Sequence, residues 1–154
     1  MANTEDFGEV ISTGVLIVGG GIGGLVTAVK AKEANPGADV LVVEKQTAGW
    51  AGKATKIGGI LAFLGPGNNG DKFLDFQVRS SGFYLNDQEL LSKYTRSTYA
   101  AIEDFEKWGA KLARTPDNKL VAFPNNFAPE LSMTFIDIDL MIPIRSKARK
   151  LGVK

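Results

Sequence analysis

The sequence predicts an α/β fold that opens with two parallel strands joined by a helix. Two predicted strands, at 13–19 and 38–44, each contain a continuous apolar run and flank an alanine-rich segment at 23–35 whose apolar residues recur at helical spacing. A glycine cluster at 19–24 stands between the first run and the helix, which is typical of a tight strand-to-helix turn. Together these observations favour a βαβ unit with a right-handed crossover.

The first apolar run shows no alternation between apolar and polar residues. A strand with one solvent-exposed face would alternate between apolar and polar residues, so residues 13–19 are predicted to form a strand that is buried on both faces. The helix is expected to end at Asn35-Pro36-Gly37, since proline and glycine both stop a helix. Residues 38–44 then form the second strand. Residues 1–12 are expected to be a polar segment in front of a domain that spans 13–154.

The chain beyond the second strand is predicted to be mostly loop and helix. Residues 45–70 are rich in glycine and have no period, so we expect one long loop. Asp71 is expected to cap a helix. Asp87 is expected to cap a second, longer helix that reaches Trp108, after which Gly109 takes the C′ position.

The last third of the chain adds a hairpin and a helix to this prediction. Residues 111–114 and 119–123 flank a proline-containing turn and predict a small hairpin. Asp137 or Asp139 is expected to cap a final helix, and residues 152–154 resemble the start of another strand. In the long helix, the spacing of the aromatic residues predicts that they pack in the core; they are Tyr94, Tyr99 and Trp108.

The composition excludes several classes of function. The 18 basic residues are balanced by 17 acidic ones, which argues against a nucleic-acid-binding protein. The chain has no cysteine and no histidine, so a disulfide, a thiolate nucleophile and a histidine base are excluded, and we expect no metal site. No apolar stretch is long enough to span a bilayer, and the N-terminus is polar. We expect a cytoplasmic protein.

The glycine cluster has the spacing of a dinucleotide-binding turn in a Rossmann-like unit. Gly19 would allow the tight turn, Gly21 would let a pyrophosphate approach the backbone, and Gly24 would let helix and strand pack closely. The helix N-terminus would then offer free N–H groups to the phosphates. Glu44, at the end of the second strand, is placed to accept the hydroxyl groups of an adenosine ribose.

Which ligand the unit takes depends on the segment that follows. NAD and S-adenosylmethionine are alternatives because their sites also use a glycine turn and an acid at a strand end. A noncatalytic remnant or interaction module that keeps the fold without a ligand is a third hypothesis. The glycine-rich residues 49–60 favour FAD over NAD, because backbone without side chains lets a large flat ring approach closely.

At this point the sequence resembles the fumarate reductase/succinate dehydrogenase flavoprotein family, which includes L-aspartate oxidases and the flavin subunits of adenylylsulfate reductases. The resemblance lies in residues 15–25, 41–45, 58–60, 86–90 and 105–109. It implies an FAD-dependent oxidoreductase in which the cofactor contacts are Gly19, Gly20, Gly21, Ile22, Gly23, Gly24, Glu44, Lys45, Ala51, Gly52, Thr55, Gly58 and Gly59.

The resemblance also implies what this chain lacks. Members that attach flavin covalently use a histidine near the position of Gly52; this chain has none, so we expect noncovalent FAD. Family members are several times longer, and their catalytic arginine, substrate ligands and capping domain lie outside the resembling part. We therefore expect an incomplete N-terminal portion of an FAD-binding domain, with no catalytic residues of its own. Its substrate and its electron-transfer partner subunit would belong to the full-length protein.

Overall fold

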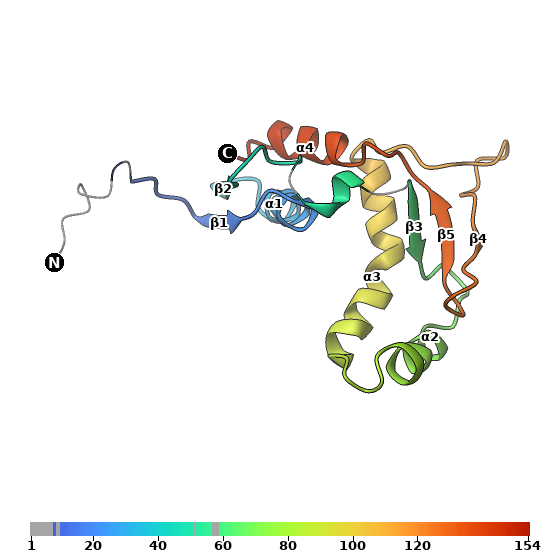
Figure 1. Cartoon of the computed structure of the whole chain (residues 1–154). Helices are drawn as coiled ribbons and strands as arrows, with labels where there is room; N and C mark the ends of the chain where they lie inside the picture. Colours follow the sequence, from blue (N-terminus) through green and yellow to red (C-terminus); the bar gives the residue numbers. More distant parts are fainter. Residues whose placement is uncertain (1–7, 9, 51, 57–58) are drawn as a thin grey trace. The chain divides into compact units, whose positions relative to one another are not determined.

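The chain has an α/β architecture, which a computed structural model describes for residues 8, 10–50, 52–56 and 59–154 (Figure 1). It divides into two compact units. The first comprises Met1–Thr55 with Ile144–Lys154, and the second comprises Lys56–Pro143. Each unit has its own sheet, so each is described by itself.

The first unit contains the predicted parallel βαβ unit. β1 (Val15–Val18) pairs with β2 (Val40–Val43) in a parallel register that sets Val15 beside Val40, and α1 (Ile22–Ala34) connects them. The C-cap of α1 is Asn35, close to the predicted end. Lys154 lies along the outer edge of β2: its N–H donates to the Val40 carbonyl at 3.0 Å, and its carbonyl accepts from Val42 N–H at 2.8 Å.

The prediction that the first strand is buried on both faces is wrong. Val15 and Ile17 are partly buried on the side of α1, whereas Leu16 is 58% exposed and Val18 is 80% exposed on the other side. Val43, the partner of Val18, is also 40% exposed. The continuous apolar run therefore gives β1 two apolar faces. Helix α1 covers one of them, and no described element covers the other.

The second unit is built on an antiparallel sheet that the sequence did not reveal. β3 (Ile60–Phe63), β5 (Ser132–Phe135) and β4 (Phe123–Pro124) lie in the order β3-β5-β4. The expected loop at 45–70 thus contains β3, and also a short 3₁₀ helix at Lys53–Lys56. The predicted hairpin at 111–123 is reduced to one isolated bridge between Arg114 and Leu120, because its strands pair with other segments.

Helix α3 (Gln88–Lys107) lies beside β3 in this unit (Figure 1). Phe63 and Tyr99 join them through a ring contact at 5.8 Å, and Thr98 Oγ1 accepts a hydrogen bond from Leu64 N–H at 3.0 Å. Trp108, only 7% exposed, is buried as predicted. Tyr94 is 56% exposed, so its prediction as a core residue is wrong.

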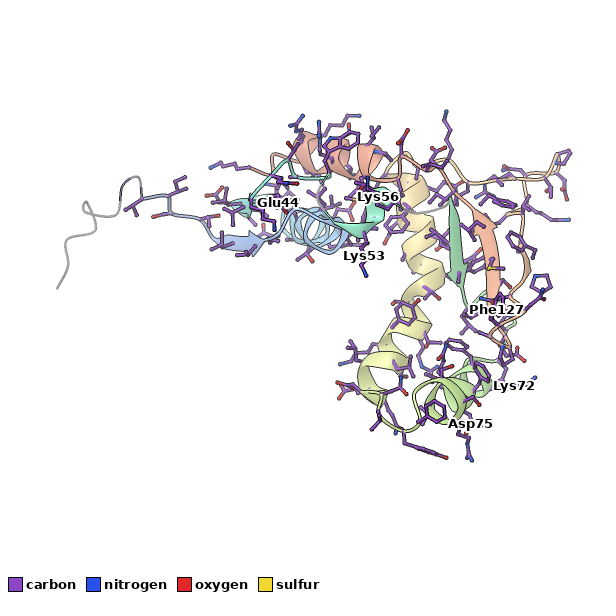
Figure 2. All side chains as sticks on the ribbon, in the orientation of Figure 1. Glu44, Lys53, Lys56, Lys72, Asp75 and Phe127 are labelled. Atoms are coloured by element: carbon purple, nitrogen blue, oxygen red, sulfur yellow. The ribbon has the colours of Figure 1, made fainter. Side chains whose placement is uncertain are left out.

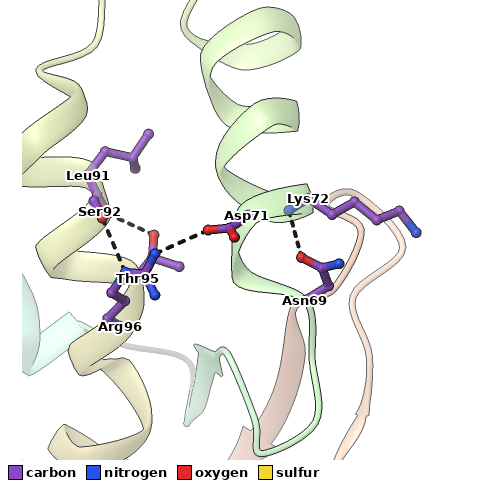
Figure 3. Close-up of polar contacts among 7 residues, drawn as sticks. All are labelled: Asn69, Asp71, Lys72, Leu91, Ser92, Thr95 and Arg96. Carbon is purple, nitrogen blue, oxygen red and sulfur yellow. Dashed lines mark hydrogen bonds and ion pairs between the residues drawn. The ribbon is translucent and has the colours of Figure 1, made fainter.

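Helix α2 (Gly70–Phe76) continues into a single π turn, Gln77–Ser81. Its cap is Asn69, which accepts from Lys72 N–H, and not Asp71 as expected; Asp71 instead pairs with Arg96 of α3 at 3.1 Å (Figure 3). The cap of α3 is Asp87, as predicted. Gly109 follows α3 with φ of 106°, which also agrees with the prediction.

The final helix is α4 (Met141–Lys150), and it begins just after Asp139, whose carbonyl accepts from Ile142 N–H. Asp137 has a different role from the cap expected for it: its carboxylate accepts a hydrogen bond from Lys111 N–H at 3.0 Å. No helix in the described part of the chain is long and apolar enough to cross a membrane.

Candidate cofactor-binding site

Two glycines of the cluster have a steric reason to be glycine. Gly19 has a φ of 104°, which only glycine adopts without strain. A Cβ built on Gly24 would lie 1.8 Å from the carbonyl oxygen of Gly19 and 3.3 Å from Ile17 Cγ2. The turn is therefore closed so tightly that α1 rests directly on the backbone of the turn and on β1.

Gly20 and Gly23 differ from this pair. A Cβ on Gly20 would lie 2.8 Å from Ala48 Cα, so the neighbouring loop, and no ligand, requires glycine there. A Cβ on Gly23 would meet nothing within 4 Å. Gly23 faces open space on the first turn of α1, a place where a side chain would fit in the absence of a ligand.

The N-terminus of α1 is open to an anion. Gly21 is its N-cap and offers no side-chain cap, and the first turn holds no acidic residue. The first N–H bonded within the helix is that of Leu25, which donates to the Gly21 carbonyl at 3.0 Å. The preceding N–H groups, including those of Ile22 and Gly23, point along the axis with the positive end of the helix dipole.

Glu44 leaves β2 at its carboxyl end and reaches back to the glycine turn (Figure 2). Its Oε2 accepts a hydrogen bond from Gly20 N–H at 2.6 Å, and its Oε1 accepts from Gln46 N–H at 3.3 Å. The Gly20 N–H lowers the pKa of this carboxyl below its ordinary value because it stabilises the charged form. Each oxygen keeps a lone pair for a further donor, such as a ribose hydroxyl.

The loop after β2 lies over the turn. A Cβ on Gly52, whose φ is 91°, would lie 3.8 Å from Gly21 Cα. The Thr55 hydroxyl donates to the Gly52 carbonyl at 3.0 Å, and its oxygen remains able to accept. Lys45 is exposed beside Glu44.

Most of the predicted set lies in the first unit. Residues 19–24, Glu44, Gly52 and Thr55 all lie in the first unit. Gly59 belongs to the second unit, where its carbonyl accepts from Ile136 N–H at 2.9 Å. Lys45 also belongs to the first unit, and the other two predicted contacts, Ala51 and Gly58, lie outside the described residues.

The loop at 47–50, which packs against the glycine turn, was not predicted from the sequence. Ala48 packs against Gly20, and Gly49 N–H donates to the Gly20 carbonyl at 2.7 Å. Gly49 has a φ of 85°, but in the sequence it is one glycine among several in a glycine-rich stretch, so its special conformation could not be predicted. Arg145 of α4 lies against Gly49; in the sequence it was explained only as part of a cationic turn of the last helix, because it is distant from the glycine cluster.

The described residues contain no group of acidic side chains arranged to hold a metal ion. Beside the site, a cavity of about 170 Å³ is lined by residues of α1, β2, the 47–50 loop and α4, among them Thr47, Arg145 and Arg149. The chemistry that the first unit offers is therefore recognition of an anion by backbone N–H groups and of a diol by a carboxylate.

Comparison with known proteins agrees with this geometry. Residues 14–132 match the family described as FAD binding domain. The fumarate reductase flavoprotein subunit of Mycobacterium tuberculosis is 28% identical over 110 residues, which are 71% of this chain and 19% of that protein. The chain thus spans about a fifth of the length of this relative.

Two solved structures share the fold. E. coli quinol fumarate reductase FrdA superposes with a TM-score of 0.77 at 17% identity, over 94% of this chain and 25% of that one. Adenylylsulfate reductase of Archaeoglobus fulgidus gives a TM-score of 0.70 at 24% identity, over 94% and 23%. The chain belongs to the FAD-binding domain family, and it is similar over part of its length to the flavoprotein subunit of a fumarate reductase.

Proposed function

We propose that this chain binds FAD noncovalently, with the pyrophosphate on residues 19–24 and the adenosine ribose on Glu44. The observation that carries the proposal is the closed glycine turn: Gly19 has a φ of 104° that only glycine adopts without strain, Gly24 leaves no room for a Cβ, and Glu44 already accepts a hydrogen bond from Gly20 N–H. An uncapped helix N-terminus for the phosphates and a carboxylate for the diol suit an adenine dinucleotide.

The residues around the glycine turn fit FAD. The space that a Cβ would fill at Gly23 is open, and the Gly52 backbone passes over the turn without a side chain. Lys45, Thr55 and the backbone near Gly59 are the further contacts that we propose, together with Ala51 and Gly58. The absence of histidine and cysteine from the sequence leaves neither of these side chains for a covalent bond to flavin.

When bound, FAD supplies reversible two-electron transfer as a hydride equivalent. The chain's own part in that reaction is to hold the adenosine end and to seat the pyrophosphate. Because it spans about a fifth of the length of its curated relative, we propose that the groups that hold the substrate lie in a further part of the flavoprotein. This portion is accordingly proposed to bind the cofactor without completing the active site.

A binding titration tests the proposal. Quenching of flavin fluorescence by the purified chain should be saturable with FAD, and ADP should compete. NAD, which shares the adenosine diphosphate half but has no flavin, should bind more weakly than FAD, and S-adenosylmethionine, which has no pyrophosphate, should not compete. Glu44→Ala should weaken the binding of both FAD and ADP by about tenfold, because it removes the charged acceptor that is proposed for the ribose hydroxyls. Gly21→Val should abolish binding.

The matched control is Glu89→Gln, which also removes one carboxylate but on the exposed surface of α3. It should leave both affinities unchanged. Tight binding of NAD that FAD does not displace would contradict the proposal, as would FAD binding that Glu44→Ala and Gly21→Val leave intact.

A further inference from the structure

The Gly20 peptide is held at both of its ends by the segment that follows β2. Its N–H donates to Glu44 Oε2 at 2.6 Å, and its carbonyl accepts from Gly49 N–H at 2.7 Å. Ala48 closes the space where a side chain of Gly20 would stand. The position of the turn therefore depends on the position of the loop at 47–50.

The loop is in turn covered by the side chain of Arg145. A Cβ built on Gly49 would lie 3.0 Å from Arg145 Cδ, 3.3 Å from its Cβ and 3.5 Å from its Cγ, so the aliphatic stem of the arginine lies against the Gly49 backbone. On either side of Arg145 in α4, Ile144 is 0% exposed and Ala148 is 2% exposed, which fixes this part of the helix in the first unit.

Packing, and not an ion pair, places this arginine. No salt bridge to Arg145 occurs among the described residues, and no acidic side chain lines the cavity that it shares with Thr47 and Arg149. When the aliphatic stem of an arginine packs on the backbone and its charge has no ion-pair partner, the arginine stabilises its surroundings chiefly through the packing of the stem.

We propose that Arg145 is a positioning residue for the dinucleotide site: its aliphatic stem holds the 47–50 loop, and through Gly49 and Glu44 it holds the Gly20 peptide that seats the pyrophosphate. This inference rests on the proposed function for its ligand. It assigns a role in the site to α4, which is separated from the glycine cluster by most of the chain.

A pair of substitutions separates the stem from the charge. Arg145→Met keeps an unbranched side chain and removes the charge, whereas Arg145→Ala removes both. ADP affinity, measured by calorimetry on the full chain, should fall about tenfold in Arg145→Ala and stay within about twofold of wild type in Arg145→Met, as expected when a preorganised loop is released. Arg149→Met, one turn further along α4, is the matched control for loss of charge and should also match wild type.

A ligand-free readout keeps the inference distinct from the proposed function. Loss of the Gly20 hydrogen bond should move the pKa of Glu44 up toward its ordinary value and speed amide exchange at Gly20, both measured by NMR; we expect this in Arg145→Ala and not in Arg145→Met. If Arg145→Ala does not fold, Arg145→Asn, whose last carbon is Cγ, and Arg145→Gln, whose last carbon is Cδ, compare a shorter uncharged side chain with a longer one.

The outcomes divide cleanly. Equal losses in Arg145→Met and Arg145→Ala would overturn the inference, because the charge would then be the active part. Unchanged Gly20 exchange and unchanged Glu44 pKa in Arg145→Ala would also overturn it. If the wild-type chain binds neither FAD nor ADP, the proposed function fails, and the NMR comparison still decides whether Arg145 holds the turn.

Discussion

Each of the two units is stabilised internally by a different kind of contact. In the first, the backbone of residues 19–24 closes on itself, and the decisive atoms are main-chain atoms of Gly19, Gly20 and Gly24. In the second, side chains distant in sequence meet: Phe63 contacts Tyr99 across β3 and α3, and Phe123 contacts Phe135 across β4 and β5 at 5.0 Å.

This difference decides what a substitution does. A unit that depends on backbone closure fails where a Cβ is added, and a unit that depends on side-chain packing fails where one is removed. Trp50 lies in the first unit and Trp108 in the second. In a Trp108→Phe background the fluorescence of Trp50 therefore reports on the first unit, and in a Trp50→Phe background that of Trp108 reports on the second.

The largest effect is expected for Gly24→Ala. Its Cβ would overlap the Gly19 carbonyl oxygen at 1.8 Å, and a backbone atom cannot move away as a flexible side chain can. We expect loss of more than about 4 kcal/mol of unfolding free energy and loss of FAD binding. Urea unfolding followed at Trp50 measures it. A stable variant with normal FAD binding would show that the turn is not closed as described.

Phe73→Ala tests the second unit in the opposite direction. Phe73 is 1% exposed in α2, so its truncation leaves a cavity and should lower the unfolding free energy by about 3–5 kcal/mol. Urea unfolding followed at Trp108 gives the value. If Trp50 reports the same shift in midpoint, the two units unfold as one and the contrast between them does not extend to stability.

Thr98→Val removes the hydrogen-bond partner of Leu64, the residue that follows β3. The hydroxyl accepts from Leu64 N–H at 3.0 Å and donates to the Thr95 carbonyl at 2.9 Å, so the variant leaves the partly buried Leu64 N–H unpaired. The expected loss is about 1–3 kcal/mol in the same assay. Thr27→Val is the control, because Thr27 is exposed and bonds only within α1; a loss as large there would point to helix propensity instead.

Gly23→Ala should stabilise the first unit, by about 0.5–1 kcal/mol. Its Cβ would meet nothing within 4 Å, and alanine restricts the unfolded chain more than glycine does. The same variant should weaken FAD, since Gly23 lies on the turn that is proposed to face the phosphates. Destabilisation at Trp50 would mean that this side of α1 is covered.

The smallest effect is a pH dependence at Glu44. Its pKa is lowered by the Gly20 N–H, so the stabilisation is present above the ordinary value of 4.5 and is lost as pH falls through the lowered pKa. The difference in melting temperature between wild type and Glu44→Gln should therefore shrink below about pH 4.5. A difference that stays constant with pH would show that the charge is not involved.

Much of the first unit could be predicted because its constraints are local. Strand, glycine turn, helix and Glu44 follow one another within a short stretch, so spacing along the chain is enough to place them. The caps at Asp87 and Gly109 were readable for the same reason. The long loop expected at 45–70 was wrong where β3 begins at Ile60, because that strand exists only through its pairing with β5, which is far away in the chain.

By itself the sequence determined the parallel βαβ unit, the tight turn at Gly19 and Gly24, and the acid at the end of β2, since each follows from backbone sterics or from local periodicity. Only the tertiary structure decided that Leu16 and Val18 lie on an open face, that Asp137 binds Lys111 N–H, and that Arg145 covers Gly49. The physical reason is that burial and contact depend on which distant segment arrives at a surface, and the spacing of residues along one segment does not specify its neighbour.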